Sequence, residues 1–243
     1  MKKVILLMSA VMMVTLGAFA QKSELGEGAD INTRFLSDEE CLKCVISLPQ
    51  PPSETSEKFA NDVKLYKSGK EECEKKNIRE ETLREDETSM FALFSSVLGM
   101  KVSKNDTPEI YKLAKTAMND GLFAAYKGQE HFKRTKPYVY FHDESLASKD
   151  GGVKDKENSY PSEYSTKGWI LAFILGVIAQ EHSEALIKCA EQYAAYRVKM
   201  GRNWKSDIDA GRTLAITIFS KEVVNPGYKQ QLLKAKAEYK SKR

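Results

Sequence analysis

The sequence predicts an all-α fold with a single domain, and three observations support this. Apolar residues recur at spacings of three and four, as in Phe59, Val63 and Tyr66, which is the period of a helix with one buried face. No segment shows the alternation of apolar and polar residues that is typical of strands. The 243 residues, of which 42% are hydrophobic, suffice for one well-filled core.

The first twenty residues have the pattern of a secretory signal. Two lysines form a positive start, and an apolar stretch follows from Val4 to Leu16. Ala18-Phe19-Ala20 then supplies the small residues of a cleavage site. The apolar stretch is short for a membrane anchor, which needs about 20 residues. We therefore expect residues 1–20 to be removed and the mature protein to be exported to the periplasm.

Residues 21–52 are predicted to be an extended arm that leads into the fold. They are polar, with few periodic apolar positions, and they end in Leu48-Pro49-Gln50-Pro51-Pro52. The helical domain is expected over residues 53–243. Within it, the densely charged stretch 71–87 is expected to be a solvated helix face with weak ion pairs.

The rest of the chain is expected to form helices joined by polar loops. Thr107-Pro108-Glu109 is typical of a helix start, with Thr107 as the cap and Pro108 at the first helical position. The apolar run from Trp169 to Ala179 is too short to cross a hydrocarbon layer of about 30 Å, so it predicts a buried core helix. A polar loop is expected over 142–160. The other helices are expected at 90–98, 183–198, 206–224 and from 226 into the basic tail.

The charge balance gives no reason to expect a polyanionic partner. The chain has 38 Lys and Arg residues against 34 Asp and Glu, and removing the two lysines of the leader from the 38 leaves 36. A mature net charge of about +2 gives no electrostatic argument for binding nucleic acid or an anionic membrane.

Four cysteines lie in the part of the chain that is expected to be exported: Cys41, Cys44, Cys73 and Cys189. In an oxidising compartment they allow two disulfides with three connectivities, and the sequence leaves the pairing open. Cys41 and Cys44 have the C-x-x-C spacing of a redox or zinc site. They lack a second ligand pair and precede a proline-rich segment, so a structural role or no role at all is favoured over a redox centre.

The sequence contains no recognisable metal or cofactor site. Its three histidines, His131, His142 and His182, have no second His or Cys at the spacing of zinc ligands. It also contains no glycine-rich phosphate loop and no G-x-S-x-G nucleophile motif. We therefore expect no cofactor.

Three segments of the second half form the most distinctive pattern. They are His131-Phe132-Lys133-Arg134-Thr135-Lys136-Pro137-Tyr138, Asn158-Ser159-Tyr160-Pro161-Ser162-Glu163-Tyr164-Ser165 and Tyr196-Arg197-Val198-Lys199-Met200-Gly201-Arg202-Asn203-Trp204-Lys205-Ser206-Asp207. Their order, spacing and flanks resemble the class A bacterial non-specific acid phosphatases, of the type 2 phosphatidic acid phosphatase and vanadium haloperoxidase superfamily. The resemblance runs from about residue 48 to the C-terminus. It implies a single-domain helical bundle, phosphomonoester hydrolysis and a homodimer, with apolar helix faces before residue 125 as candidate contacts.

The resemblance also implies a set of site residues, which this chain keeps only in part. In that family one His attacks phosphorus, an Asp orients it, and a second His protonates the leaving oxygen. These three positions fall on Asn203, Asp207 and Tyr164. The family's phosphoryl oxygens are held by a Lys, two Arg, a Ser and a Gly amide, whose positions fall on Gln129, Lys136, Arg197, Ser162 and Glu163.

The substitutions predict that the inherited chemistry is lost. An imidazole attacks through a ring nitrogen with a free lone pair, whereas the lone pair of the Asn203 amide nitrogen is delocalised into its carbonyl group. That amide can still donate to Asp207, which lies four residues further on and hence on the same face of a helix. Tyr164 has a reference pKa of about 10, so it protonates a leaving group less readily than His near neutral pH. Glu163 would repel a phosphate dianion if its carboxylate points into the pocket, which the sequence leaves open.

Three interpretations of the function follow. The favoured one is an exported acid-phosphatase-like protein without turnover, a pseudoenzyme, that keeps a cationic pocket for a phosphorylated or other small anionic ligand. Its candidate cations are Lys136, Arg197, Arg134 and Arg202, and pairing with Glu163 and Asp207 would instead make them a neutral structural network. The second is an active phosphomonoesterase in which another group substitutes, with the candidates His131, His142 and Asp207. The third is a periplasmic scaffold that contacts a partner through the arm, the charged helix or the basic tail.

Overall fold

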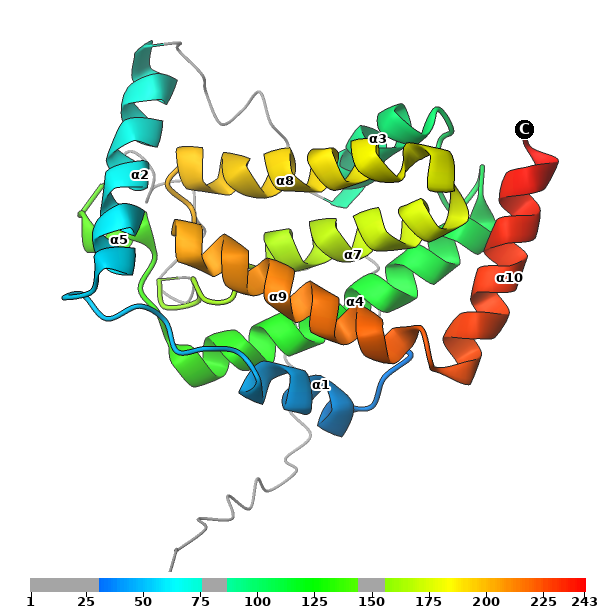
Figure 1. Ribbon diagram of the computed structural model, residues 1–243, viewed down its shortest axis with the longest axis horizontal. Helices are drawn as coiled ribbons and strands as arrows, with labels where there is room; N and C mark the ends of the chain where they lie inside the picture. Colours follow the sequence, from blue (N-terminus) through cyan, green and yellow to red (C-terminus); the bar gives the residue numbers. More distant parts are fainter. Residues whose placement is uncertain (1–30, 76–86, 144–155) are drawn as a thin grey trace, which may run out of the picture. The chain divides into compact units, whose positions relative to one another are not determined.

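A computed structural model of the chain describes residues 31–75, 87–143 and 156–243, and these residues form helices and loops without a strand (Figure 1). The prediction of an all-α fold is confirmed. Residues Ile31–Arg243 form one compact unit. The expected leader at 1–20, much of the charged stretch 71–87 and much of the loop 142–160 lie outside the described residues.

The helices that were expected from the periodicity are present, with ends that differ by a few residues. In chain order the elements are α1 (Asp38–Ile46), α2 (Glu57–Lys75), α3 (Glu87–Leu98), α4 (Pro108–Phe132), α5 (Pro137–Tyr140), α7 (Glu163–Ile178), the 3-10 turn η3 (Gln180–His182), α8 (Ser183–Lys199), α9 (Lys205–Glu222) and α10 (Pro226–Ser241). The predicted start of α4 is confirmed, with Thr107 as its cap and Pro108 as its first residue. α7 begins before its apolar run because Ser162 caps it, with Ser162 Oγ accepting the Ser165 N–H at 3.3 Å.

Residues 38–46, inside the stretch expected to be an extended arm, form helix α1. A capping box starts it: Ser37 Oγ accepts the Glu40 N–H, and the Glu40 carboxylate accepts the Ser37 N–H at 2.9 Å. The apolar face of α1 packs against α4 and α9. Its buried residues are Cys41, Cys44 and Val45.

α7 is the central helix of the fold. Figure 1 shows it between α8 and α9, and it packs against α4 as well. It is apolar on nearly every side, and most of its residues from Ser165 onward are buried, as expected of a helix surrounded by others. The run that begins at Trp169 is therefore the core helix that was predicted.

The N-terminal end of α7 lies close against α9, and Gly211 permits this approach. A Cβ atom at Gly211 would lie 2.6 Å from the Ser162 carbonyl oxygen and 2.8 Å from Ser165 Cβ, which is closer than van der Waals contact. The backbone N–H of Ser162 donates to the carbonyl oxygen of Asp207 at 3.1 Å. The packing of two helices thus fixes two of the motif segments against each other.

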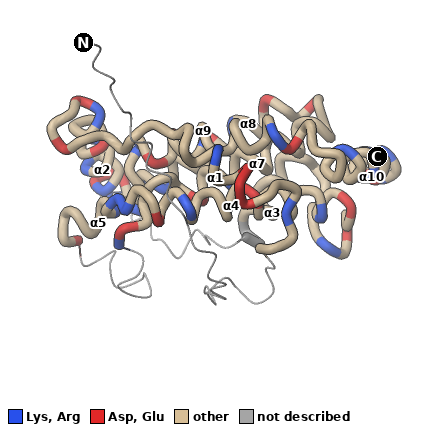
Figure 2. Tube along the Cα trace, turned by 90° about the horizontal axis from the view of Figure 1, so that it is seen from below, with Lys and Arg blue, Asp and Glu red and all other residues tan. Residues whose placement is uncertain are grey.

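Basic and acidic residues are interspersed along the described helices, in keeping with the near balance of charge in the sequence (Figure 2). Among these helices, none has both the length and the apolar character that crossing a membrane requires.

All four cysteines are thiols in this structure, and none is in a disulfide. Cys41, Cys44 and Cys189 are buried. Burial raises the pKa of Cys41 to about 12 and those of Cys44 and Cys189 to about 11. Because the thiolate is the reactive form of cysteine, the C-x-x-C pair is held in an unreactive state in the core.

Candidate functional site

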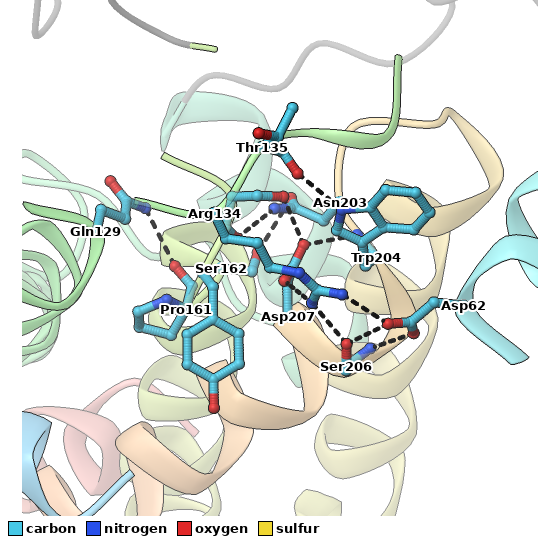
Figure 3. A network of polar contacts seen from close by, with 12 residues as sticks. Asp62, Gln129, Arg134, Thr135, Pro161, Ser162, Asn203, Trp204, Ser206 and Asp207 are labelled. Carbon is cyan, nitrogen blue, oxygen red and sulfur yellow. Dashed lines mark hydrogen bonds and ion pairs between the residues drawn. The ribbon is translucent and has the colours of Figure 1, made fainter. Parts of the chain in front are cut away.

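The three motif segments meet at the N-terminal end of α7. They are the connection from α4 to α5, the loop that precedes α7, and the connection from α8 to α9. Figure 3 shows their polar side chains converging on Asn203 and Asp207.

A tight reversal after α8 brings Arg197 and Asn203 together. Gly201 adopts a φ of 67°, the left-handed conformation that is common just beyond a helix C-terminus. The backbone N–H groups of Arg202 and Asn203 then both donate to the carbonyl oxygen of Arg197, at 2.9 and 3.3 Å. The side chain of Arg197 and the side chain of Asn203 therefore face the same space.

The side-chain amide of Asn203 lies at the centre of the site. Its Oδ1 accepts hydrogen bonds from Ser162 Oγ at 3.2 Å and from Arg197 Nε at 3.1 Å. Its Nδ2 donates to the carbonyl oxygen of Ser159 at 3.0 Å. The prediction that Asn203 and Asp207 lie on the same face of a helix is wrong, because α9 begins only at Lys205. Asn203 therefore does not share a helix face with Asp207.

Asp207 has a separate set of donors. Its carboxylate accepts from Arg134 Nη1 and Ser159 Oγ, both at 2.5 Å, and from the Trp204 N–H at 2.7 Å. It lies in the first turn of α9, where the helix dipole favours a negative charge. Burial nevertheless raises the pKa of Asp207 to about 6, against the opposing effects of Arg134 and the hydrogen bonds.

Arg134 links Asp207 to a second buried carboxylate, Asp62 of α2. Its Nη2 donates to Asp62 Oδ2 at 2.9 Å, and its Nη1 donates to Ser206 Oγ at 2.6 Å. The Ser206 N–H donates to Asp62 Oδ1 at 2.9 Å. The guanidinium group thus lies between two carboxylates and ties α2 to the start of α9 (Figure 3).

Sequence reasoning missed Asp62 and Ser159. For Asp62 a signal exists: it is three residues after Phe59 and four before Tyr66, so it lies on the apolar face of α2. A carboxylate on a buried face needs a partner, and here the partner is Arg134. For Ser159, nothing in the local sequence pattern indicates that its hydroxyl donates to Asp207 while its carbonyl oxygen accepts from Asn203.

Tyr164, at the general-acid position, stacks against Arg197. The guanidinium carbon lies 3.9 Å from the ring centroid, and Lys167 Nζ lies 4.9 Å from it. These are cation–π distances. Arg197 is therefore engaged on one side by the Asn203 amide and on its flat face by an aromatic ring.

The other predicted phosphate-holding residues are placed differently. Gln129 Nε2 donates to the Pro161 carbonyl oxygen at 3.1 Å (Figure 3). Lys136 is buried and precedes the first residue of α5, and Glu163 is the half-buried first residue of α7. Direct contact joins Ser162, Arg197, Asn203 and Tyr164, and Ser159 connects this group to Asp207.

The histidines take no part in these contacts. His131 and His142 are exposed, and His182 ends η3 at the far end of α7. Across the described ranges, no three His, Cys, Asp or Glu side chains are grouped as metal ligands would be.

An all-α bundle that gathers three such motif segments at the buried end of its central helix is a domain of the acid phosphatase type. No protein-family model matches the chain. The chain is 29% identical to a non-specific acid phosphatase of Providencia stuartii over 253 aligned residues, which cover 98% of each protein. It is 27% identical to a non-specific acid phosphatase of Salmonella typhimurium over 218 residues, which cover 86% of this chain and 84% of the other. Over most of its length, the chain is therefore similar to bacterial non-specific acid phosphatases.

Proposed function

We propose that this protein is an exported member of the family that has lost phosphomonoester hydrolysis and retains at most the binding of phosphate or another small anion. The observation that carries the proposal is the position of the Asn203 side chain. Its carbonyl oxygen accepts hydrogen bonds from Ser162 and Arg197, two groups that the family resemblance assigns to phosphoryl oxygens.

The groups that the sequence offered as nucleophiles are poorly placed to attack phosphorus. The Asn203 amide nitrogen lacks an available lone pair and donates to Ser159. Asp207 is the remaining candidate, but it is fully buried and its carboxylate is occupied by three donors, one of them the Arg134 guanidinium. A nucleophile so engaged would have to give up a buried ion pair before reacting. These features argue against the alternative of an active enzyme with substitute groups.

Two of the candidate cations are already engaged within the chain, one by carboxylates and one by neutral groups. Arg134 is paired with Asp207 and Asp62, as in the alternative of a structural network. Arg197 is engaged by Asn203 and Tyr164. An anion that enters must displace the Asn203 amide oxygen, so binding is expected to be weak.

Export rests on the pattern of the first twenty residues, and we infer from it a periplasmic location. The homodimer implied by the family resemblance is part of the same proposal. Isolation of the mature protein from the periplasmic fraction, with Gln21 as its first residue, tests the export.

Hydrolysis of p-nitrophenyl phosphate from acidic to neutral pH tests the loss of turnover, with Asp207→Asn as the matched variant. We expect no hydrolysis above the uncatalysed background in either the protein or the variant. A rate that the variant loses would overturn the proposal, and turnover by both would also overturn it. A shift of the melting temperature by phosphate or vanadate would then separate a binding protein from a scaffold that ignores anions.

A further inference from the structure

A second buried polar cluster lies where α4, the end of α9 and the segment before α1 meet. Asp120 of α4 and Glu222 of α9 are both 0% exposed. The carboxyl group of Asp120 accepts the backbone N–H groups of Phe35 at 3.2 Å and of Leu36 at 3.1 Å. The carboxyl groups of Asp120 and Glu222 lie close enough together to shift each other's pKa.

This proximity requires a proton. In the described part of the chain, neither oxygen of Glu222 receives a hydrogen bond from an N–H or O–H group. Two ionised carboxylates only accept, so they cannot bond to each other, and two like charges buried side by side repel strongly. The arrangement is stable only if one of the two groups stays protonated.

The surrounding groups do not replace that proton. Arg34 acts on Asp120 but forms its ion pair with Asp38. The hydroxyl of Tyr228 on α10 is buried near Glu222 and has no partner among the described residues. Cys41 and Cys44 are the other titratable groups that interact with the pair, and Lys221 acts on Cys44.

Desolvation has the largest effect on the pKa values of both carboxyl groups in this cluster. Burial raises the pKa of Asp120 to about 6, and it raises the pKa of Glu222 well above its ordinary value. Both carboxyl groups therefore hold protons more tightly in the folded protein than in the unfolded chain.

The pair also holds the segment 33–36 in place. The Asn119 side chain donates to the Thr33 carbonyl oxygen at 3.1 Å, and the Asn225 side chain donates to the Phe35 carbonyl oxygen at 2.8 Å. With the two N–H groups bound to Asp120, most of the polar contacts of this segment converge beside the pair. α1 follows directly, and its Cys41 Sγ donates to the Asp120 carbonyl oxygen at 3.8 Å.

We propose that Asp120 and Glu222 form a protonated carboxyl pair and that the loss of its protons at rising pH weakens the docking of the segment 33–36 and α1 on the other helices. A group whose pKa is higher in the folded state than in the unfolded state stabilises the fold at low pH, and this contribution is lost as the pH rises through the folded pKa. The window for Asp120 lies between its ordinary pKa of about 4 and its folded pKa of about 6, and Glu222 extends it upward. The segment 33–36 is therefore expected to be bound firmly to the other helices at acidic pH and more loosely at neutral and alkaline pH.

Amide hydrogen exchange measured by mass spectrometry, corrected for the intrinsic effect of pH, tests this on the purified protein. The opening equilibrium of peptides covering 33–46 is expected to rise at least about tenfold from about pH 5 to about pH 8. In Glu222→Gln the amide donates to an ionised Asp120, so the rise is expected to shrink to less than about threefold. Asp209→Asn, an exposed acid on the same helix, is the matched control and keeps the full rise.

The measurement on the unsubstituted protein decides the proposal even if Glu222→Gln fails to fold. Equal opening at the two pH values would overturn it, and so would a full rise that persists in a folded Glu222→Gln variant. The infrared band of a protonated carboxyl group gives a second readout, taken as the part of the band that Glu222→Gln removes, because Asp207 also has a raised pKa. It is expected in acid and lost at alkaline pH, and its absence in acid would contradict a protonated pair.

Discussion

Replacing Arg134 by Met is expected to destabilise the protein strongly. The guanidinium group of Arg134 lies between the carboxylates of Asp62 and Asp207, at 2.9 and 2.5 Å. The two carboxylate side chains are 1% and 0% exposed, so water cannot solvate their charges when the cation is removed. The variant therefore keeps two buried acids and no balancing charge.

The magnitude follows from the burial of this ion-pair network. Removing one partner of a buried ion pair costs about 3–5 kcal/mol, because the other charge stays behind unpaired. The cost depends on pH. Arg134 lowers the pKa of Asp207, so its removal raises that pKa above about 6. A carboxyl group with a raised pKa contributes stability at low pH that is lost as the pH rises, so the deficit of Arg134→Met is expected to be smaller in acid than near neutral pH.

Urea unfolding followed by circular dichroism, at about pH 5 and about pH 7.5, measures this difference in the free energy of unfolding. Lys205→Met is the matched control, because it removes an exposed cation whose partner, Asp209, lies one turn further along α9. Such a pair contributes about 0.5 kcal/mol or less. An Arg134→Met variant within about 1 kcal/mol of the unsubstituted protein, or with the same deficit at both pH values, would refute the reasoning.

Two further predictions concern the packing of the core. Gly211→Ala is expected to cost about 1–3 kcal/mol in urea unfolding, because its methyl group would press on the carbonyl oxygen of Ser162. Gly176→Ala, whose methyl group meets nothing closer than 3.5 Å, is the control and is expected to be neutral or stabilising; equal costs for the two would contradict the account. An aromatic disulfide reagent is expected to modify the half-buried Cys73 in the folded protein, and rapid reaction of more than one thiol would contradict the burial of the others. The thiols expected to react only after unfolding are Cys41, Cys44 and Cys189.

The fold was predictable because its helices are long and strongly periodic. α7 stands out as a wholly apolar run, and α4 begins with a recognisable Thr-Pro start. α1 was not predicted, although Ser37 and Glu40 have the spacing of a capping box. With few apolar positions, a helix this short shows no clear period, and contacts with α4 and α9 stabilise it.

The site was predictable as a set of positions but not as a set of contacts. The family resemblance assigned Ser162, Arg197 and Asn203 to one site, and the structure joins them by hydrogen bonds. The partner of Asn203 was not predictable, because it depends on where α9 begins. The pair of Asp120 and Glu222 joins residues far apart in the chain, and sequence periodicity carries no information about such pairs.

In the proposed function, the Asn203 amide oxygen takes the place of a phosphoryl oxygen between Ser162 and Arg197. Calorimetric titration of Asn203→Ala with inorganic phosphate tests it most directly. Hydrogen bonds to charged groups contribute about 1.5–3 kcal/mol, so freeing these donors is expected to tighten phosphate binding by about tenfold or more. Gln129→Ala is the matched control, because it removes a nearby buried amide that bonds to the Pro161 carbonyl oxygen instead. An affinity that is unchanged or weaker in Asn203→Ala, or equally raised in Gln129→Ala, would contradict the account.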